Sequence, residues 1–356
     1  MHAESHLTRT RSASTLLGVA LVALACLAGC EQYRPQLAIT LPDSCNTPDG
    51  MTLCDKTNVM YLSCPNFCEN ISYPAKIVKI MPNNEWEIFC TLPAHPDTNR
   101  CGAMGLDIGP DGNLYVADNQ YFYNTQRKSR LLRVKIKDGK YDGTEVAAAG
   151  FSLANAVIWR DNAVYVSDTF SEEEGKSYIY RITMEEMKQG TVQIMPGDAD
   201  PHVLAIQKTI KRGRGDTAGA DGLTFDGDGN LYCGNFGDGR VFKYTFDKDG
   251  KATQKLLIDN EELLPSADGM FWREADNTIY ITDSASNAVR AFTPEGKIWT
   301  IWENEDTTGA DGLLDQPCEA IVRGNELFVV CFDMTFPGLK NSAYDKDHTI
   351  SVIQLK

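Results

Sequence analysis

The chain has 356 residues, of which 42% are hydrophobic and 23% are charged, a composition that is typical of a globular protein and excludes a disordered or fibrous one. Its formal net charge of −15 argues against nucleic acid as a partner, because binding to phosphates requires clustered Lys and Arg. The 29 Gly, 14 Tyr and 14 Phe favour strands joined by tight turns, and therefore an all-β fold.

The N-terminus has the pattern of an export signal. Arg9 and Arg11 precede an apolar run over residues 16–28, which is short for a membrane-spanning helix. The run ends in Leu-Ala-Gly-Cys at residues 27–30, which resembles the bacterial lipoprotein box. The alternative is an ordinary cleaved signal followed by an incidental cysteine.

The lipoprotein resemblance implies a location. Residues 1–29 are then a cleaved signal peptide, and Cys30 is lipidated and anchors the chain to the membrane. Glu31, in the place where an Asp would retain a lipoprotein in the inner membrane, implies the outer membrane of the cell envelope, on its periplasmic or surface face. Residues 30–44 are expected to be a linker.

Cysteine spacing indicates disulfides more than a metal site. Nine cysteines follow Cys30, at positions 45, 54, 64, 68, 90, 101, 233, 318 and 331. An exported chain is expected to contain disulfides, with Cys90 and Cys101 as a pair that flanks one loop. Cys233, alone in the middle of the chain, is expected to be free. No Cys-x-x-Cys pair repeats, which argues against a structural zinc site.

One sequence pattern recurs along the chain. Its clearest copy, residues 221–235, has two alternating apolar runs around an Asp-Gly turn, which is the signal of a β-hairpin. Further copies occupy residues 49–64, 104–118, 155–168, 268–283 and 319–331. Each copy is followed by further strand-like runs, so that about 50 residues contain four strands, the signature of a propeller blade. The sequence predicts a six-bladed β-propeller over residues 45–356, with four antiparallel strands per blade.

The longest step between two copies contains an insertion over residues 184–215. We expect a short helix at residues 184–189 and note a basic run at residues 208–214. The run is either a solvated loop or part of a site for an anionic substrate, because it leads directly into the strand that starts at Asp221.

The first residue of each copy is expected to lie at one rim of the central channel. These residues are Asp49, Met104, Asn155, Asp221, Asp268 and Glu319. Carboxylates that converge in a channel repel one another unless they are protonated or bind a cation. Oxygen ligands favour a hard divalent ion: calcium is expected, with magnesium, manganese or zinc as the other candidates. Asp-Gly turn chemistry would explain three of the acids without a metal, but not Asn155 or Glu319.

These repeats resemble the senescence marker protein (SMP-30), gluconolactonase and luciferin-regenerating enzyme family of six-bladed propellers, over essentially the whole chain after the signal. Asp221-Gly-Leu and Asp268-Gly-Met are close to the family's Asn-Gly-Leu and Pro-Asp-Gly-Met motifs, whereas Asn155 begins Asn-Ala-Val. The family holds a divalent metal at the channel mouth through Glu, Asn and Asp. The resemblance implies Asn155, Asp221 and Glu319 as ligands, with Asp49 as an alternative because the family's Glu lies in the first blade.

The activity implied by the resemblance is hydrolysis of a small-molecule lactone. Asp221 is expected to act as base as well as ligand, and Asp268 is a second candidate base. A non-catalytic, lipid-anchored propeller that serves as a binding or scaffold protein is the alternative, and a different reaction on the same frame is a third possibility. A monomer is expected. His95, His202 and His348 occupy none of the leading positions and are expected in loops or on the surface.

Overall fold

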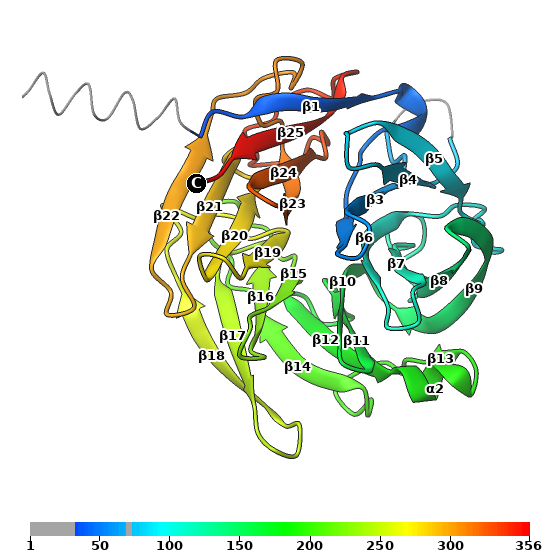
Figure 1. The fold of residues 1–356 in the computed structure, drawn as a ribbon. Coiled ribbons are helices and arrows are strands. Elements are labelled where there is room, and N and C mark those ends of the chain that lie inside the picture. Colours follow the sequence, from blue (N-terminus) through cyan, green and yellow to red (C-terminus); the bar gives the residue numbers. More distant parts are fainter. Residues whose placement is uncertain (1–32, 69–72) are drawn as a thin grey trace, which may run out of the picture.

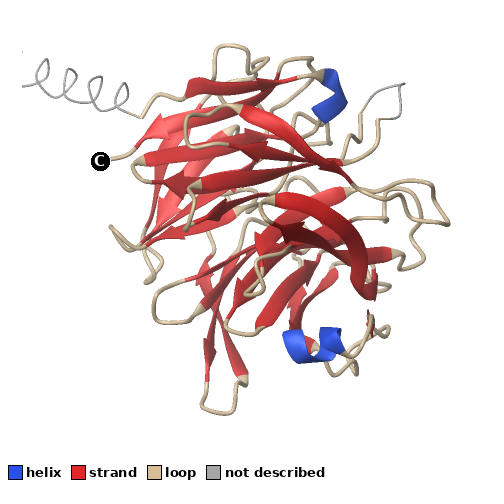
Figure 2. Cartoon of the chain, turned by 45° about the vertical axis from the view of Figure 1, so that its right-hand side comes forward, coloured by secondary structure: helices blue, strands red, loops and turns tan. Residues whose placement is uncertain are grey.

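A computed structural model of the chain describes residues 33–68 and 73–356. Strands dominate this part of the chain, with one short α-helix and one short 3-10 helix, η1 (Asp43–Cys45) (Figure 2). In the described ranges, no helix has the length and hydropathy to cross a membrane. The predicted signal peptide, residues 1–29, and the predicted lipidation site, Cys30, lie outside the described residues.

The strands form six separate sheets (Figure 1). Blade one contains β2 (Met51–Cys54), β3 (Val59–Cys64), β4 (Lys76–Ile80) and β5 (Trp86–Thr91). Blade two contains β6 (Ala103–Ile108), β7 (Leu114–Asp118), β8 (Ser129–Lys137) and β9 (Lys140–Phe151). Blade three contains β10 (Ala154–Arg160), β11 (Ala163–Asp168), β12 (Lys176–Thr183) and β14 (Val203–Lys208).

The second half of the chain repeats this arrangement. Blade four contains β15 (Ala220–Phe225), β16 (Leu231–Asn235), β17 (Val241–Phe246) and β18 (Ala252–Ile258). Blade five contains β19 (Met270–Arg273), β20 (Thr278–Asp283), β21 (Ala288–Phe292) and β22 (Ile298–Glu303). Blade six contains β23 (Pro317–Arg323), β24 (Glu326–Cys331), β25 (His348–Gln354) and β1 (Gln36–Leu41). The predicted six-bladed β-propeller is confirmed.

The inner strands β2, β6, β10, β15, β19 and β23 contact one another in a closed ring. The second strand of each blade is almost entirely buried, because neighbouring blades cover both of its faces. The hydrophobic cores accordingly lie between blades: one joins Ile77 and Cys90 of blade one to Leu106 and Val116 of blade two. Each blade therefore depends on its neighbours to bury its faces.

The ring is closed by the N-terminal strand. β1 pairs in antiparallel fashion with β25, so that the two ends of the described chain share blade six (Figure 1). The predicted linker over residues 30–44 is therefore wrong for residues 36–41, and the propeller starts before Cys45. Their partner strand lies about 300 residues away in the sequence, so no local turn signal marks them as a strand.

The predicted insertion over residues 184–215 contains the expected helix, but its extent is wrong, because residues 203–208 form β14 of blade three. Its helix, α2 (Met184–Lys188), is capped by Thr183, which exchanges hydrogen bonds with Glu186 as in a capping box. β13 (Val192–Gln193) then adds a fifth strand to blade two, parallel to β9.

Several side chains depart from the predictions. Cys90 and Cys101 are both free thiols, so the predicted disulfide is not formed. Both pack as small apolar side chains in the core between the first two blades. Cys233 is free, as predicted. His95 lies in a loop and His202 in a turn, as predicted, although His95 is buried. His348 is buried and is the first residue of β25, contrary to the prediction.

Candidate active site at the channel mouth

A cavity of about 420 Å³ lies at one end of the central channel. Its lining includes five of the six residues that the repeat pattern placed at the rim: Asp49, Met104, Asn155, Asp221 and Asp268. The structure therefore brings together side chains that are up to 219 residues apart in the sequence (268 − 49).

The backbone of the inner strands explains why these side chains face the cavity. Met104, Asn155 and Asp221 each lie at a register shift near the start of the inner strand of their blade, and a β-bulge re-aims the side chain that it carries. The next residue has little room for a side chain: a Cβ on Gly222 would lie 2.1 Å from the carbonyl oxygen of Asp268. The Asp-Gly pattern thus reflects the close approach of neighbouring inner strands.

Glu319 is not at the ring position of its blade. The residue that lines the mouth cavity there is Cys318, because the register shift of β23 falls between Pro317 and Glu319. Glu319 lies one layer deeper, beside Gly269, and lines a second cavity of about 670 Å³ on the other side of the ring. The placement of Glu319 at the rim is therefore corrected. Aligning Pro317-Cys318 with Pro48-Asp49 would have given the correct register.

Three carboxyl groups at the mouth interact directly. Asp268 accepts hydrogen bonds from Ser284 Oγ at 2.6 Å and from the backbone N–H of Gly269 at 2.9 Å, and it shares a hydrogen bond with Asp221. Burial, followed by the charge of Asp268, raises the pKa of both Asp49 and Asp221 well above the usual range. Burial raises the pKa of Asp268 to about 7. These groups cannot all be ionised at neutral pH without a neutralising charge.

Two further groups at the mouth have defined orientations. Asn155 donates its side-chain N–H to Thr169 Oγ1 at 3.1 Å, which turns its amide oxygen away from Thr169. The Cys318 thiol contacts the backbone carbonyls of Pro48 and Val330, each at 3.5 Å. Burial raises the pKa of this thiol well above its usual range, which favours the protonated thiol in the metal-free protein.

The donor set at the mouth therefore fits a hard divalent cation. It consists of the carboxylates of Asp49, Asp221 and Asp268 and the amide of Asn155, and oxygen donors of this kind suit calcium or magnesium. Glu319 approaches from the layer below, close enough for its charge to raise the pKa of Asp221. Burial of several acids with few counter-charges is the observation that a bound cation would explain.

The wall above the carboxylates is largely apolar. Five phenylalanines line it: Phe122, Phe170, Phe236, Phe332 and Phe336. Arg214 is the basic residue of this wall, and it stacks on Phe236 with 5.1 Å from the guanidinium carbon to the ring centroid. Its side chain is 10% exposed and lies 3.6 Å from Asp216, while its Nε and Nη1 have no hydrogen-bond partner.

The rest of the predicted basic run lies elsewhere. Lys208, Lys211 and Arg212 form ion pairs with Glu173, Glu174 and Asp259. Only Arg214 from this run lines the cavity. The sequence therefore located the segment but did not distinguish the one side chain that reaches the site.

Together, the fold and the site define a six-bladed β-propeller with an acidic, oxygen-rich channel mouth. The sequence profile of the SMP-30/gluconolactonase/LRE-like region matches residues 38–262. The chain belongs to this family. No curated protein sequence matches the chain.

Solved structures of low sequence identity share the fold. A calcium-binding regucalcin from Agrobacterium tumefaciens has a TM-score of 0.58 at 12% identity, with 91% of this chain and 96% of that chain covered. A luciferin-regenerating enzyme has a TM-score of 0.57 at 13% identity, with 91% and 96% covered. A gluconolactonase from Xanthomonas campestris has a TM-score of 0.55 at 12% identity, with 91% and 95% covered. At these identities the likeness concerns the fold.

Proposed function

We propose that this protein is a metal-dependent hydrolase that opens a lactone at the channel mouth. The observation that carries the proposal is the convergence of Asp49, Asp221 and Asp268 with Asn155 in one cavity. Family membership and the similarity to a gluconolactonase and a calcium-binding regucalcin support it. Asp49, Asp221 and Asn155 would hold the cation, calcium in the first instance, with Glu319 beneath them.

The residues of the chain have distinct roles in this proposal. A bound divalent cation would supply polarisation of the lactone carbonyl. Asp268, held by Ser284 and Gly269, takes a proton from the attacking water, since a positioned carboxylate can act as a general base. The water oxygen bonds to the acyl carbon and the ring C–O bond breaks. The proton returns to the ring oxygen, and a hydroxy acid is the product.

The wall of the cavity restricts the substrate class. A polyhydroxylated sugar lactone would leave its hydroxyl groups unpaired against the five phenylalanines, and buried polar groups without partners are costly. The two unpartnered N–H groups of Arg214 are suited to a carboxylate or another anionic group. The substrate proposed here is a lactone with an apolar or aromatic body and one negative charge.

The test is hydrolysis of a lactone panel by the full chain, with calcium, manganese or EDTA present. Turnover that EDTA abolishes and metal restores is expected. Asp221→Asn should lose both metal stimulation and turnover, and Asp268→Asn should lower kcat by roughly 10²–10⁴. Asp228→Asn is the matched control, because this exposed residue lies in the same hairpin as Asp221.

Two results would contradict the proposal. Full turnover in Asp221→Asn would remove this residue from the mechanism. No turnover of any lactone in the presence of metal would favour a propeller that binds a ligand without catalysis, or one that runs a different reaction.

We also propose that the protein acts as a monomer anchored to the outer membrane through Cys30, since residues 27–30 resemble a lipoprotein box. Mass spectrometry of the N-terminal peptide of the native protein, compared with Cys30→Ser, would detect the acyl chains.

A further inference from the structure

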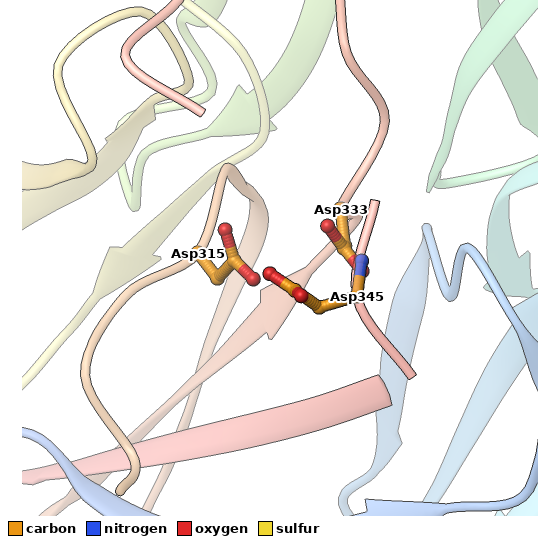
Figure 3. Close-up of side chains that lie close together, drawn as sticks. All are labelled: Asp315, Asp333 and Asp345. Atoms are coloured by element: carbon orange, nitrogen blue, oxygen red, sulfur yellow. The ribbon is translucent and has the colours of Figure 1, made fainter. Parts of the chain in front are cut away.

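A second group of carboxylates lies outside the channel-mouth cavity. Asp315 belongs to the loop before β23, and Asp333 and Asp345 belong to the loop between β24 and β25. One carboxylate oxygen from each residue lies within 4.8 Å of the other two. Figure 3 shows the Asp345 side chain extending toward Asp315, with Asp333 beside it. None of the three lines the channel-mouth cavity.

The environment of these acids is unusual for a group of like charges. Asp315 is 1% exposed and Asp333 is 2% exposed. The charges that act on Asp315 come from Asp333, Asp345 and Asp306, and all are negative. Asp333 does have partners, since it accepts hydrogen bonds from Asn341 Nδ2 at 3.2 Å and from the backbone N–H of Asp345 at 2.9 Å.

Asp315 differs from Asp333, because its buried Oδ1 has no hydrogen-bond partner. The buried Thr349 hydroxyl is nearby, since a Cβ built on Gly309 would lie 2.7 Å from it and 3.7 Å from Asp315 Oδ2, but this hydroxyl interacts with the Cys331 thiol. Unsatisfied buried oxygens are rare in proteins and require an explanation such as an ion.

We propose that Asp315, Asp333 and Asp345 form a second divalent-cation site, occupied by calcium. Three carboxylates supply up to six oxygens, and calcium takes about six to eight. The ligand oxygens all lie within 4.8 Å of one another, so one divalent cation can bridge them. Calcium accepts several carboxylates, whereas magnesium usually keeps several waters and binds only one or two carboxylates.

The position of the site gives it a structural role. Asp333 lies near the start of the loop between β24 and β25, and Asp345 lies near its end, so one ion closes this loop on itself. Asp315 connects it to the neighbouring loop. Gln316 and Phe332, adjacent in sequence to Asp315 and Asp333, line the channel-mouth cavity. The ion would therefore fix one wall of the cavity without contacting the substrate.

The experiment counts calcium ions on the EDTA-treated full chain by native mass spectrometry and isothermal titration calorimetry. Asp345→Asn is expected to bind one calcium fewer per chain than the wild type. Asp347→Asn is the matched control, because it removes the same charge from an exposed position two residues away in the same loop, and it should bind as many ions as the wild type.

The count is repeated in the Asp221→Asn background. There the difference of one ion between Asp345→Asn and Asp347→Asn should persist, because this site is independent of the proposed lactonase site. Equal ion counts for these two variants in both backgrounds would overturn the proposal. Crystals soaked in terbium give a test without substitutions: an anomalous peak between the three carboxylates is expected, and no peak there would overturn the proposal.

Discussion

Arg214 is held in place at the cavity wall while two of its donors are left without partners. Its Nη2 donates to the carbonyl of Phe236 and its guanidinium stacks on the ring of the same residue. Burial lowers the pKa of Arg214, which is the direction expected when a cation is removed from water without full compensation. A negatively charged substrate would provide that compensation.

Arg214→Gln should therefore weaken the use of anionic lactones selectively. Loss of a charge-assisted hydrogen bond costs about 1.5–3 kcal/mol, which corresponds to roughly 10- to 100-fold in kcat/KM. A neutral analogue of the same lactone should change by less than about threefold. Lys211→Gln removes the same charge from an exposed ion pair with Glu174 and should leave both substrates unaffected. An equal loss on the anionic and neutral substrates would contradict this role.

The site also shows which residues a repeat pattern can locate. The alignment of hairpins placed Asp49, Met104, Asn155, Asp221 and Asp268 correctly at one cavity, because a bulge or a Gly recurs at the same offset in those blades. It failed by one residue at Glu319, where Cys318 replaces the Asp of the Asp-Gly pair. Asp333 and Asp345 were missed because their loop is no part of the repeat.

Among the elements, β1 closes the ring, because it pairs with β25 of blade six and packs against blade one. Ile39 pairs with Ile350 of β25, is 4% exposed and packs in a core that includes Met51 and Met60 of blade one. Leu37 lies on the same strand, but the register shift between Leu37 and Ile39 places it on the opposite face, where it is 42% exposed. One face of β1 thus packs at the junction of blade six and blade one, and the other face is largely exposed to solvent.

Ile39→Ala should lower the free energy of unfolding by about 2–5 kcal/mol, the usual cost of removing a buried aliphatic side chain. Leu37→Ala should change it by about 0.5 kcal/mol or less, as exposed substitutions do. Equilibrium urea denaturation measures both. Similar effects of the two substitutions would mean that the pairing of β1, and not the packing of Ile39, holds the ring closed.

The fold itself was predictable because the strands of one blade lie close together in the sequence. Four consecutive strands joined by turns leave an alternating pattern and Asp-Gly signals within about 50 residues, and blades one, two, four and five have their four strands in this order. In blade three, α2 and β13 separate β12 from β14. Blade six takes its fourth strand from the other end of the chain. Two strands that are so far apart in the sequence leave no local signal of their pairing, so the residues of β1 were predicted to be a linker.

At the scale of the whole molecule, the chain is acidic, with a net charge of −15. Two clusters of acidic side chains lie in its interior: Asp49, Asp221 and Asp268 at the channel mouth, and Asp315, Asp333 and Asp345 beside it. Cations would neutralise the interior at both places. Calcium is therefore expected to stabilise the folded chain, since a ligand that binds only the native state raises its stability.

The acids beside the channel mouth contribute to the pH dependence of stability, in the same direction as Asp49, Asp221 and Asp268, whose pKa values burial also raises. Burial raises the pKa of Asp315 to about 8 and that of Asp333 to about 7, well above the usual range of a carboxyl group. In the folded, calcium-free chain these groups hold protons that the unfolded chain has released. Their protonation stabilises the fold fully below about pH 4, and this contribution is lost as the pH rises through 7 and 8. In EDTA, Tm should accordingly fall between pH 7 and pH 8.5.

Asp315→Asn isolates this effect, because it removes a titrating group and keeps the side-chain volume. In EDTA, its Tm should fall less steeply over the same pH range. The comparison is needed because the Cys45 thiol, whose pKa is lowered to about 7 mainly by a hydrogen bond with Cys64, acts in the opposite direction. Calcium binds the ionised carboxylates, so the Tm gain it gives the wild type should be larger at pH 8.5 than at pH 7. Parallel Tm curves for wild type and Asp315→Asn in EDTA would show that Asp315 does not titrate in this range.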